Sequence, residues 1–103
     1  MNMVPSTEPS TEGASHTLDI VVSNKLGLHA RASAKLTQLA SRFDSEIFIS
    51  RNNKRVNAKS IMGVMMLAAG KGTTVTVDAV GPDAEQALAQ IKTLFNERFG
   101  EAE

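Results

Sequence analysis

The spacing of apolar residues changes repeatedly along this chain, and these changes constrain the fold more than any other feature. Residues 17–23 and 73–80 place apolar side chains at every second position, which predicts half-buried strands. Residues 30–43 and 84–99 place them three or four positions apart, which predicts amphipathic helices. Strands and helices are therefore both expected in the folded chain.

Shorter elements lie between these segments. Residues 46–50 and 54–57 are predicted to be strands joined by a polar hairpin turn. Residues 61–69 form an apolar, methionine-rich run suited to a short helix, which glycines then close. The resulting order is strand, helix, strand, strand, helix, strand, helix, and it predicts an α+β fold with a mostly antiparallel sheet and helices on one face. Because the strands alternate apolar and polar residues, the other face is expected to contact water.

The first 16 residues differ in composition from the rest of the 103-residue chain. They are rich in Ser, Thr, Pro, Glu and Gly and hold almost nothing that a core could bury, which is typical of a flexible tail. They also lack the basic start and the apolar middle of a secretory signal. We therefore expect a tail over residues 1–16, one domain over residues 17–103 and a cytoplasmic location.

The overall composition argues against several classes of protein. Lys plus Arg and Asp plus Glu each total 11, and a net charge of zero does not favour binding to nucleic acid. The chain has no Trp or Tyr to stack on bases, no Cys, and no apolar run near the roughly 20 residues that span a bilayer. The two His residues are far apart in the sequence, so no metal site is expected. We accordingly expect a monomer that binds no nucleic acid, membrane or metal.

His29 is the residue best placed for chemistry, at the junction of a turn and the first long predicted helix. The first turn of a helix carries free backbone N–H groups and the positive end of the dipole, which together attract anions. A neutral imidazole nitrogen is nucleophilic near pH 7, so His29 could accept a phosphoryl group transiently. The N–H groups of Ala30 and Arg31 and the Arg31 guanidinium would then hold that group. Alternatively, His29 is a polar turn residue and Arg31 a solvated one, and spacing alone leaves both interpretations open.

Ser60 precedes the short predicted helix and has two compatible interpretations. Its hydroxyl suits an N-cap, which is the simpler role for a serine in this position. It could also be phosphorylated, because a phosphoserine at a helix N-terminus is electrostatically tolerated.

The apolar run after this serine suggests a surface for partners. Three of the five Met residues of the chain fall within it: Met62, Met65 and Met66. Met is an adaptable side chain that recurs on binding surfaces, although it also fills cores. Because a short helix cannot bury every side, we expect Ile61 and either Val64 or Leu67 to lie inside and at least one Met to be exposed.

Two separated motifs carry a family resemblance. Residues 26–32 read LGLHARA, and residues 56–67 read VNAKSIMGVMML. The first is similar to the active-site segment, and the second to the regulatory-serine segment, of the HPr family, the histidine phosphocarriers of the bacterial phosphoenolpyruvate-dependent phosphotransferase system. Gly70-Lys71-Gly72, an alternating strand and a final helix complete the pattern, so that the resemblance leaves only the tail uncovered.

The resemblance implies both a fold and a function. The fold would be an open-faced β-sandwich, in which a four-stranded antiparallel sheet is covered on one face by three helices in the order βαββαβα. His29 would be the phosphorylated histidine, with Arg31 beside it to stabilise the phosphoryl group. The protein would be a phosphocarrier without a cofactor of its own, not an autonomous enzyme.

The resemblance also implies partners. Enzyme I, charged from phosphoenolpyruvate, would donate the phosphoryl group, and an enzyme II A-type acceptor would receive it. Ser60 would be the serine modified by the ATP-dependent HPr kinase/phosphorylase. Ile61, Met62 and Met65 would lie in the surface that these partners share.

One departure from the family pattern leaves the branch of the family undecided. Ala32 stands where the family often has Pro, and this resembles the nitrogen-related branch. The segment around Ser60 instead resembles the HPr of organisms that possess the serine kinase. Transport of sugar and regulation therefore both stay open, and so does a regulatory binding module in which phosphorylation of His29 and Ser60 controls docking without sugar transport.

Overall fold

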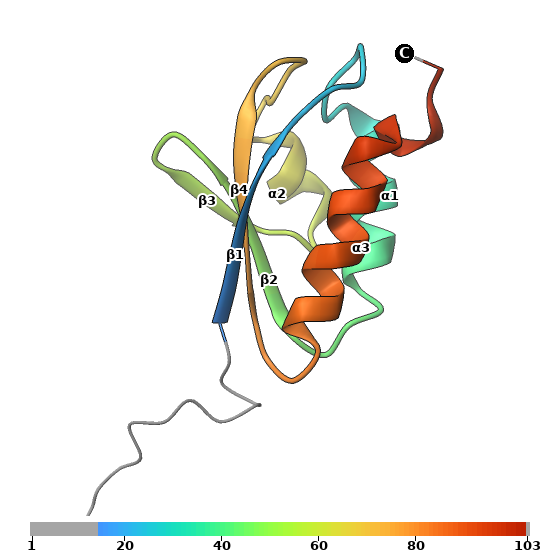
Figure 1. The fold of residues 1–103 in the computed structure, drawn as a ribbon. Coiled ribbons are helices and arrows are strands. Elements are labelled where there is room, and N and C mark those ends of the chain that lie inside the picture. Colours follow the sequence, from blue (N-terminus) through green and yellow to red (C-terminus); the bar gives the residue numbers. More distant parts are fainter. Residues whose placement is uncertain (1–14, 103) are drawn as a thin grey trace, which may run out of the picture.

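The computed structural model describes residues 15–102, and in that range the chain forms a four-stranded sheet covered on one face by three α-helices (Figure 1). The strands are antiparallel and lie in the order β1-β4-β2-β3. The elements in chain order are β1 (Ser15–Val21), α1 (Ala30–Ala40), β2 (Glu46–Arg51), β3 (Lys54–Asn57), α2 (Ile61–Met65), β4 (Thr74–Val80), α3 (Ala84–Asn96) and the short 3-10 helix η2 (Arg98–Gly100). The predicted α+β open-faced sandwich is confirmed.

The hydrophobic core lies between the sheet and the helices. Strand β4 is flanked by β1 and β2, and its alternate residues Val75, Val77 and Ala79 are buried. Leu36 of α1 and Ile91 of α3 are buried above them and belong to the same cluster. The period-two pattern of β4 thus reflects one face that packs under helices.

The face of the sheet away from the helices is polar. Across β1 and β4, Thr17 Oγ1 donates a hydrogen bond to Asp78 Oδ1 at 2.7 Å. Two pairs further along, on the same face, Thr76 Oγ1 donates to Asp19 Oδ1 at 2.7 Å, and both bonds are exposed. The prediction that this face contacts water is confirmed.

Strand β1 begins earlier than the sequence predicts. It starts at Ser15, which pairs with Val80, and His16 pairs with Ala79. The predicted tail of residues 1–16 therefore extends too far by two residues, because the pairing of β1 with β4 continues beyond the apolar part of the strand to His16 and Ser15. The rest of the predicted tail, residues 1–14, lies outside the described residues.

All three α-helices end before their apolar patterns do. Helix α1 ends at Ala40, and Phe43 reaches the core from the turn that follows. Helix α2 ends at Met65. Helix α3 ends at Asn96, because the backbone turns into the left-handed region before Phe99 completes the stripe. In each case apolar side chains beyond the helix still pack inward, which a helical pattern cannot distinguish from continued helix.

Candidate functional site

The loop between β1 and α1 fixes where the first helix begins. Asn24 is fully buried in this loop, and its Nδ2 donates a hydrogen bond to the Gly27 carbonyl oxygen at 2.8 Å. Gly27 N donates to the Asn24 carbonyl oxygen at 3.2 Å, and Leu28 N donates to the Ala69 carbonyl oxygen at 2.9 Å. Two of these bonds are internal to the loop, and the third joins it to the segment between α2 and β4. Together they place His29 at the N-cap of α1.

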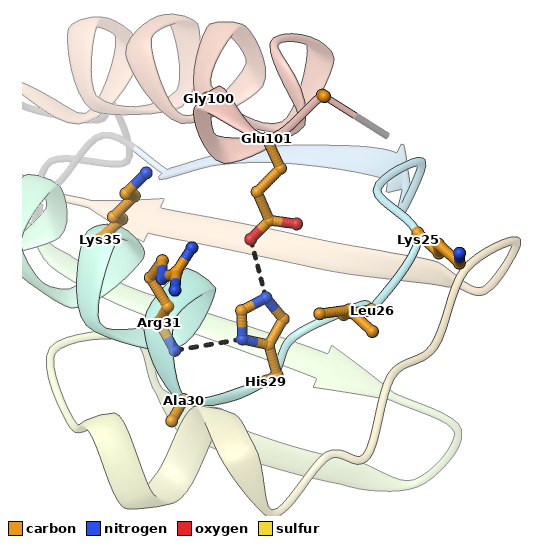
Figure 2. Close-up of a pocket in the computed structure, with 9 residues that line it drawn as sticks. Lys25, Leu26, His29, Ala30, Arg31, Lys35, Gly100 and Glu101 are labelled. Carbon is orange, nitrogen blue, oxygen red and sulfur yellow. Dashed lines mark hydrogen bonds and ion pairs between the residues drawn. The ribbon is translucent and has the colours of Figure 1, made fainter.

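His29 caps α1 with its own side chain (Figure 2). Its backbone is extended, with φ −75° and ψ −176°, and its carbonyl oxygen accepts a hydrogen bond from Ser33 N at 2.8 Å. Its Nδ1 accepts a hydrogen bond from Arg31 N at 3.2 Å. His29 therefore lies at the helix start that the sequence predicts, with one ring nitrogen beside a backbone N–H group.

The other ring nitrogen contacts an acidic residue from the end of the chain. His29 Nε2 lies 2.7 Å from Glu101 Oε2 (Figure 2). Asn24 Nδ2 donates to the other carboxylate oxygen, Glu101 Oε1, at 3.1 Å. The hydrogen bond from Asn24 lowers the pKa of Glu101, desolvation by burial raises it, and the hydrogen bond from His29 lowers it further. An ionised carboxylate only accepts hydrogen bonds, and Nδ1 accepts one from Arg31 N, so these contacts favour the neutral tautomer with its proton on Nε2.

An open pocket of about 770 Å³ surrounds the ring. Its lining residues are Lys25, Leu26, His29, Ala30, Arg31, Lys35, Gly100, Glu101 and Ala102. The Arg31 side chain is exposed, and its guanidinium makes no hydrogen bond or ion pair with the rest of residues 15–102. Positive charge from α1 and its preceding loop therefore outweighs the one carboxylate in this lining, which suits an anion that arrives and leaves.

Sequence reasoning missed part of this lining. Lys25 and Lys35 flank the predicted residues along the loop and α1, and a helix period would have placed Lys35 one turn below Arg31. Glu101 is different, because it lies 72 residues from His29 in the sequence and no local pattern connects the two. The pocket unites the predicted His29, Ala30 and Arg31, whereas the predicted residues of α2 lie outside its lining.

Ser60 is the N-cap of α2, as the sequence predicts. Its backbone is extended, and its Oγ accepts a hydrogen bond from Gly63 N at 3.1 Å. The residue is only partly buried, so the hydroxyl lies near the surface while it caps the helix.

The exposed face of α2 is apolar. Met62 is 75% exposed, and Met66 is 61% exposed, which confirms the prediction that at least one Met faces solvent. Val64 is fully buried. Ile61 is 42% exposed, so the prediction that it lies inside is wrong. It begins a helix of only five residues, and Val64 already occupies the inward side of that helix. We refer to Ile61, Met62, Met65 and Met66 as the α2 patch.

Residues 15–102 contain neither a candidate metal site nor a candidate membrane-spanning helix. No group of three or more His, Cys, Asp or Glu side chains in that range is arranged to hold a metal ion. No helix there has both the length and the apolar character needed to cross a membrane.

Comparison with known proteins gives consistent matches. Residues 17–97 match the PTS-HPr family, described as the PTS HPr component phosphorylation site. The chain is 60% identical over 85 residues to phosphocarrier protein HPr of Cupriavidus necator, which covers 82% of this chain and 96% of that protein. It is 47% identical over 83 residues to phosphocarrier protein NPr of Shewanella violacea, which covers 81% of this chain and 91% of that protein.

The fold also resembles solved structures. The crystal structure of HPr-C-His from Thermoanaerobacter tengcongensis matches with a TM-score of 0.83 and 43% sequence identity. The match covers 85% of this chain and 99% of that one. The two proteins are therefore similar in amino-acid sequence as well as in fold.

Proposed function

The chain belongs to the HPr family of phosphocarrier proteins of the phosphotransferase system, and we propose that His29 is the residue that carries its phosphoryl group. One observation supports this assignment above the others. The ring of His29 is held at the start of α1 with Nδ1 as a hydrogen-bond acceptor and Nε2 facing a carboxylate. The nitrogen with the available lone pair is therefore the one nearest the N–H groups and the positive end of the helix.

The transfer follows from this arrangement. Nδ1 attacks the phosphorus of the charged donor, which we propose is enzyme I, and the bond between phosphorus and the donor breaks. The N–H groups of Ala30 and Arg31 lie in the first turn of α1, which has no helical acceptors, and they bond to the phosphoryl oxygens. The exposed Arg31 guanidinium adds a charge-assisted contact.

The same site favours release. The His29 side chain is 25% exposed and its pocket is open, so an enzyme II A-type acceptor can reach the phosphorus. The one carboxylate in the lining, Glu101, is engaged by His29 and Asn24, which supports a carrier and not an autonomous enzyme. A cytoplasmic location and a monomeric state remain parts of this proposal.

Phosphorylation with enzyme I and phosphoenolpyruvate tests the proposal. We expect the intact protein to gain the mass of one phosphoryl group, and mild acid should remove it, because a phosphorus–nitrogen bond is labile in acid while a serine ester is not. Peptide mapping should place the label on His29. An acid-stable label, or one on another residue, would contradict the assignment.

We also propose that Ile61, Met62 and Met65 dock these partners. All three are more than two-fifths exposed on one short helix that packs beside α1. Exposed Met side chains adapt to different surfaces, which suits a protein that must contact a donor and an acceptor in turn.

A regulatory role for Ser60 is a further part of the proposal, with HPr kinase/phosphorylase as the modifying enzyme. Ser60 is partly exposed beside the α2 patch, and its Oγ accepts a hydrogen bond from Gly63 N at the helix start, which supports this proposal. A phosphate there would gain from the helix N-terminus and would add negative charge to an uncharged apolar surface.

Ser60→Asp is expected to slow phosphorylation by enzyme I by about tenfold or more, because a charge at the docking surface must be desolvated. Ser60→Asn is the matched control, since Asn has the same size and caps helices equally well without charge. Initial rates of His29 labelling at limiting enzyme I provide the measurement. Equal rates for the two variants would argue against a switch at Ser60.

The comparisons favour the HPr branch over the NPr branch. The HPr of Cupriavidus necator shares 60% identity with this chain, against 47% for the NPr of Shewanella violacea. A regulatory module without sugar transport is the second candidate, and the position of Ser60 beside the α2 patch is the observation that favours it. Transfer of the label from His29 to an enzyme II A-type protein would favour the role in transport over the regulatory module.

A further inference from the structure

We propose that Glu101 is a positioning residue for His29, which fixes the ring proton on Nε2 and offsets the positive charge that the ring acquires when Nδ1 bonds to phosphorus. This inference rests on the proposed phosphorylation of His29. It adds a residue from the far end of the chain to a site that is otherwise built from one loop and one helix.

The backbone after α3 is shaped to bring Glu101 to this place. Arg98, Phe99 and Gly100 all have positive φ values, of 56°, 56° and 77°. Such values are uncommon for residues other than glycine, so the turn must be held by its surroundings. Phe99 supplies that hold, because it is 1% exposed and packs its ring edge-on against Phe95, with 4.8 Å between centroids.

Polar contacts complete the positioning. Lys35 Nζ of α1 donates to the Phe99 carbonyl oxygen at 2.5 Å. The buried Asn24 donates to one carboxylate oxygen of Glu101. His29 Nε2 lies against the other oxygen (Figure 2). Glu101 is 13% exposed, so its charge acts on the ring with less screening than at the open surface. The carboxylate is thus fixed by the loop and by the core, independently of the ring.

The chemistry balances without movement of a proton. When Nδ1 bonds to phosphorus with its lone pair, the bond to the donor breaks and that electron pair leaves with the donor. The ring, still protonated at Nε2, becomes cationic and faces the Glu101 carboxylate. When the acceptor attacks phosphorus, the bond to Nδ1 breaks, its electron pair returns to Nδ1, and the ring is neutral with the same proton on Nε2. Glu101 stabilises the cationic ring in both directions.

The test compares ring tautomers and transfer rates in full-length variants. Nitrogen-15 NMR of the neutral ring should show the wild type mostly protonated at Nε2, and Glu101→Ala should lose that preference. Glu101→Gln should keep it, because the amide oxygen still accepts from Nε2, yet both variants should be labelled by enzyme I about tenfold more slowly, since the charge is gone. Glu97→Gln, which removes an exposed carboxylate near the end of α3, should behave as wild type.

The outcomes separate this inference from the function on which it rests. A wild type that is labelled on His29, together with a Glu101→Ala variant of unchanged tautomer and rate, would overturn the role of Glu101 alone. An unlabelled His29 in the wild type would overturn the proposed function and this inference with it. A Glu101→Gln variant that keeps the wild-type tautomer but is labelled slowly would support the role of the charge. A loss of packing at the C-terminal end would not produce this combination.

Discussion

Replacing His29 with asparagine is expected to abolish phosphoryl acceptance while the fold remains intact. The asparagine side chain has no nucleophilic ring nitrogen, but its oxygen can accept from the N–H groups of α1 as His29 Nδ1 does now. His29→Ala lacks both properties and should also lower the free energy of unfolding by about 1 kcal/mol, the usual cost of a lost N-cap. Labelling with enzyme I and unfolding in urea measure the two effects on the same samples.

This pair of variants separates chemistry from helix capping. Neither should be labelled, and only the alanine variant should be less stable. The chain contains one other histidine, His16 in β1, so acid-labile label on His29→Asn would move the assignment there. A strongly destabilised asparagine variant would instead show that the ring supports the fold through its contact with Glu101.

Gly27→Ala is expected to cause the largest loss of stability of any variant considered. Gly27 has φ +67°, and a Cβ atom there would lie 2.5 Å from the Ala69 carbonyl oxygen and 2.8 Å from Gly70 Cα. Both are backbone atoms, and Ala69 already accepts the hydrogen bond of Leu28 N, so neither can move without breaking the loop. The strained φ and the overlap together should cost about 2–5 kcal/mol, a large part of the stability of a small domain.

Gly72→Ala is the matched control for this effect. Gly72 also has positive φ, at +90°, but no atom lies within 4 Å of the position that its Cβ would take. It should therefore lose only the backbone component, about 1–2 kcal/mol. Urea midpoints measure both variants, and equal losses would mean that close approach to Ala69 is not what limits residue 27. A shifted loop in Gly27→Ala should also slow labelling of His29, which follows it directly.

The elements and the central residues of the site could be predicted from the sequence because their causes are local. Alternation in residues 74–80 arises from one buried face of β4, and the helical stripe that follows residue 30 defines α1. The position of His29 before that stripe was enough to place its ring beside N–H groups. Ser60 could likewise be recognised as a cap from the few residues around it.

What could not be predicted depends on contacts between distant segments. Phe99 fits the helical stripe of α3, yet it lies in a left-handed turn that the packing against Phe95 stabilises. Neither residue 98 nor residue 99 is of a type that favours such a turn, so the local sequence does not predict that Glu101 contacts His29. The exposure of Ile61 was missed for a related reason, because the length of α2 is decided by its surroundings and not by its apolar run.

The backbone N–H of Arg31 affects the relative free energy of the phosphorylated and unphosphorylated states of the protein. It now donates to Nδ1, the atom that the proposed transfer occupies. Once phosphorus takes that lone pair, the same N–H can donate to a phosphoryl oxygen instead, so this donor has an acceptor in both states. Because one acceptor replaces another, the hydrogen bond of this amide contributes little to the free-energy difference between the phosphorylated and the unphosphorylated protein. A small difference allows the phosphoryl group to pass to an acceptor as readily as it is received from the donor.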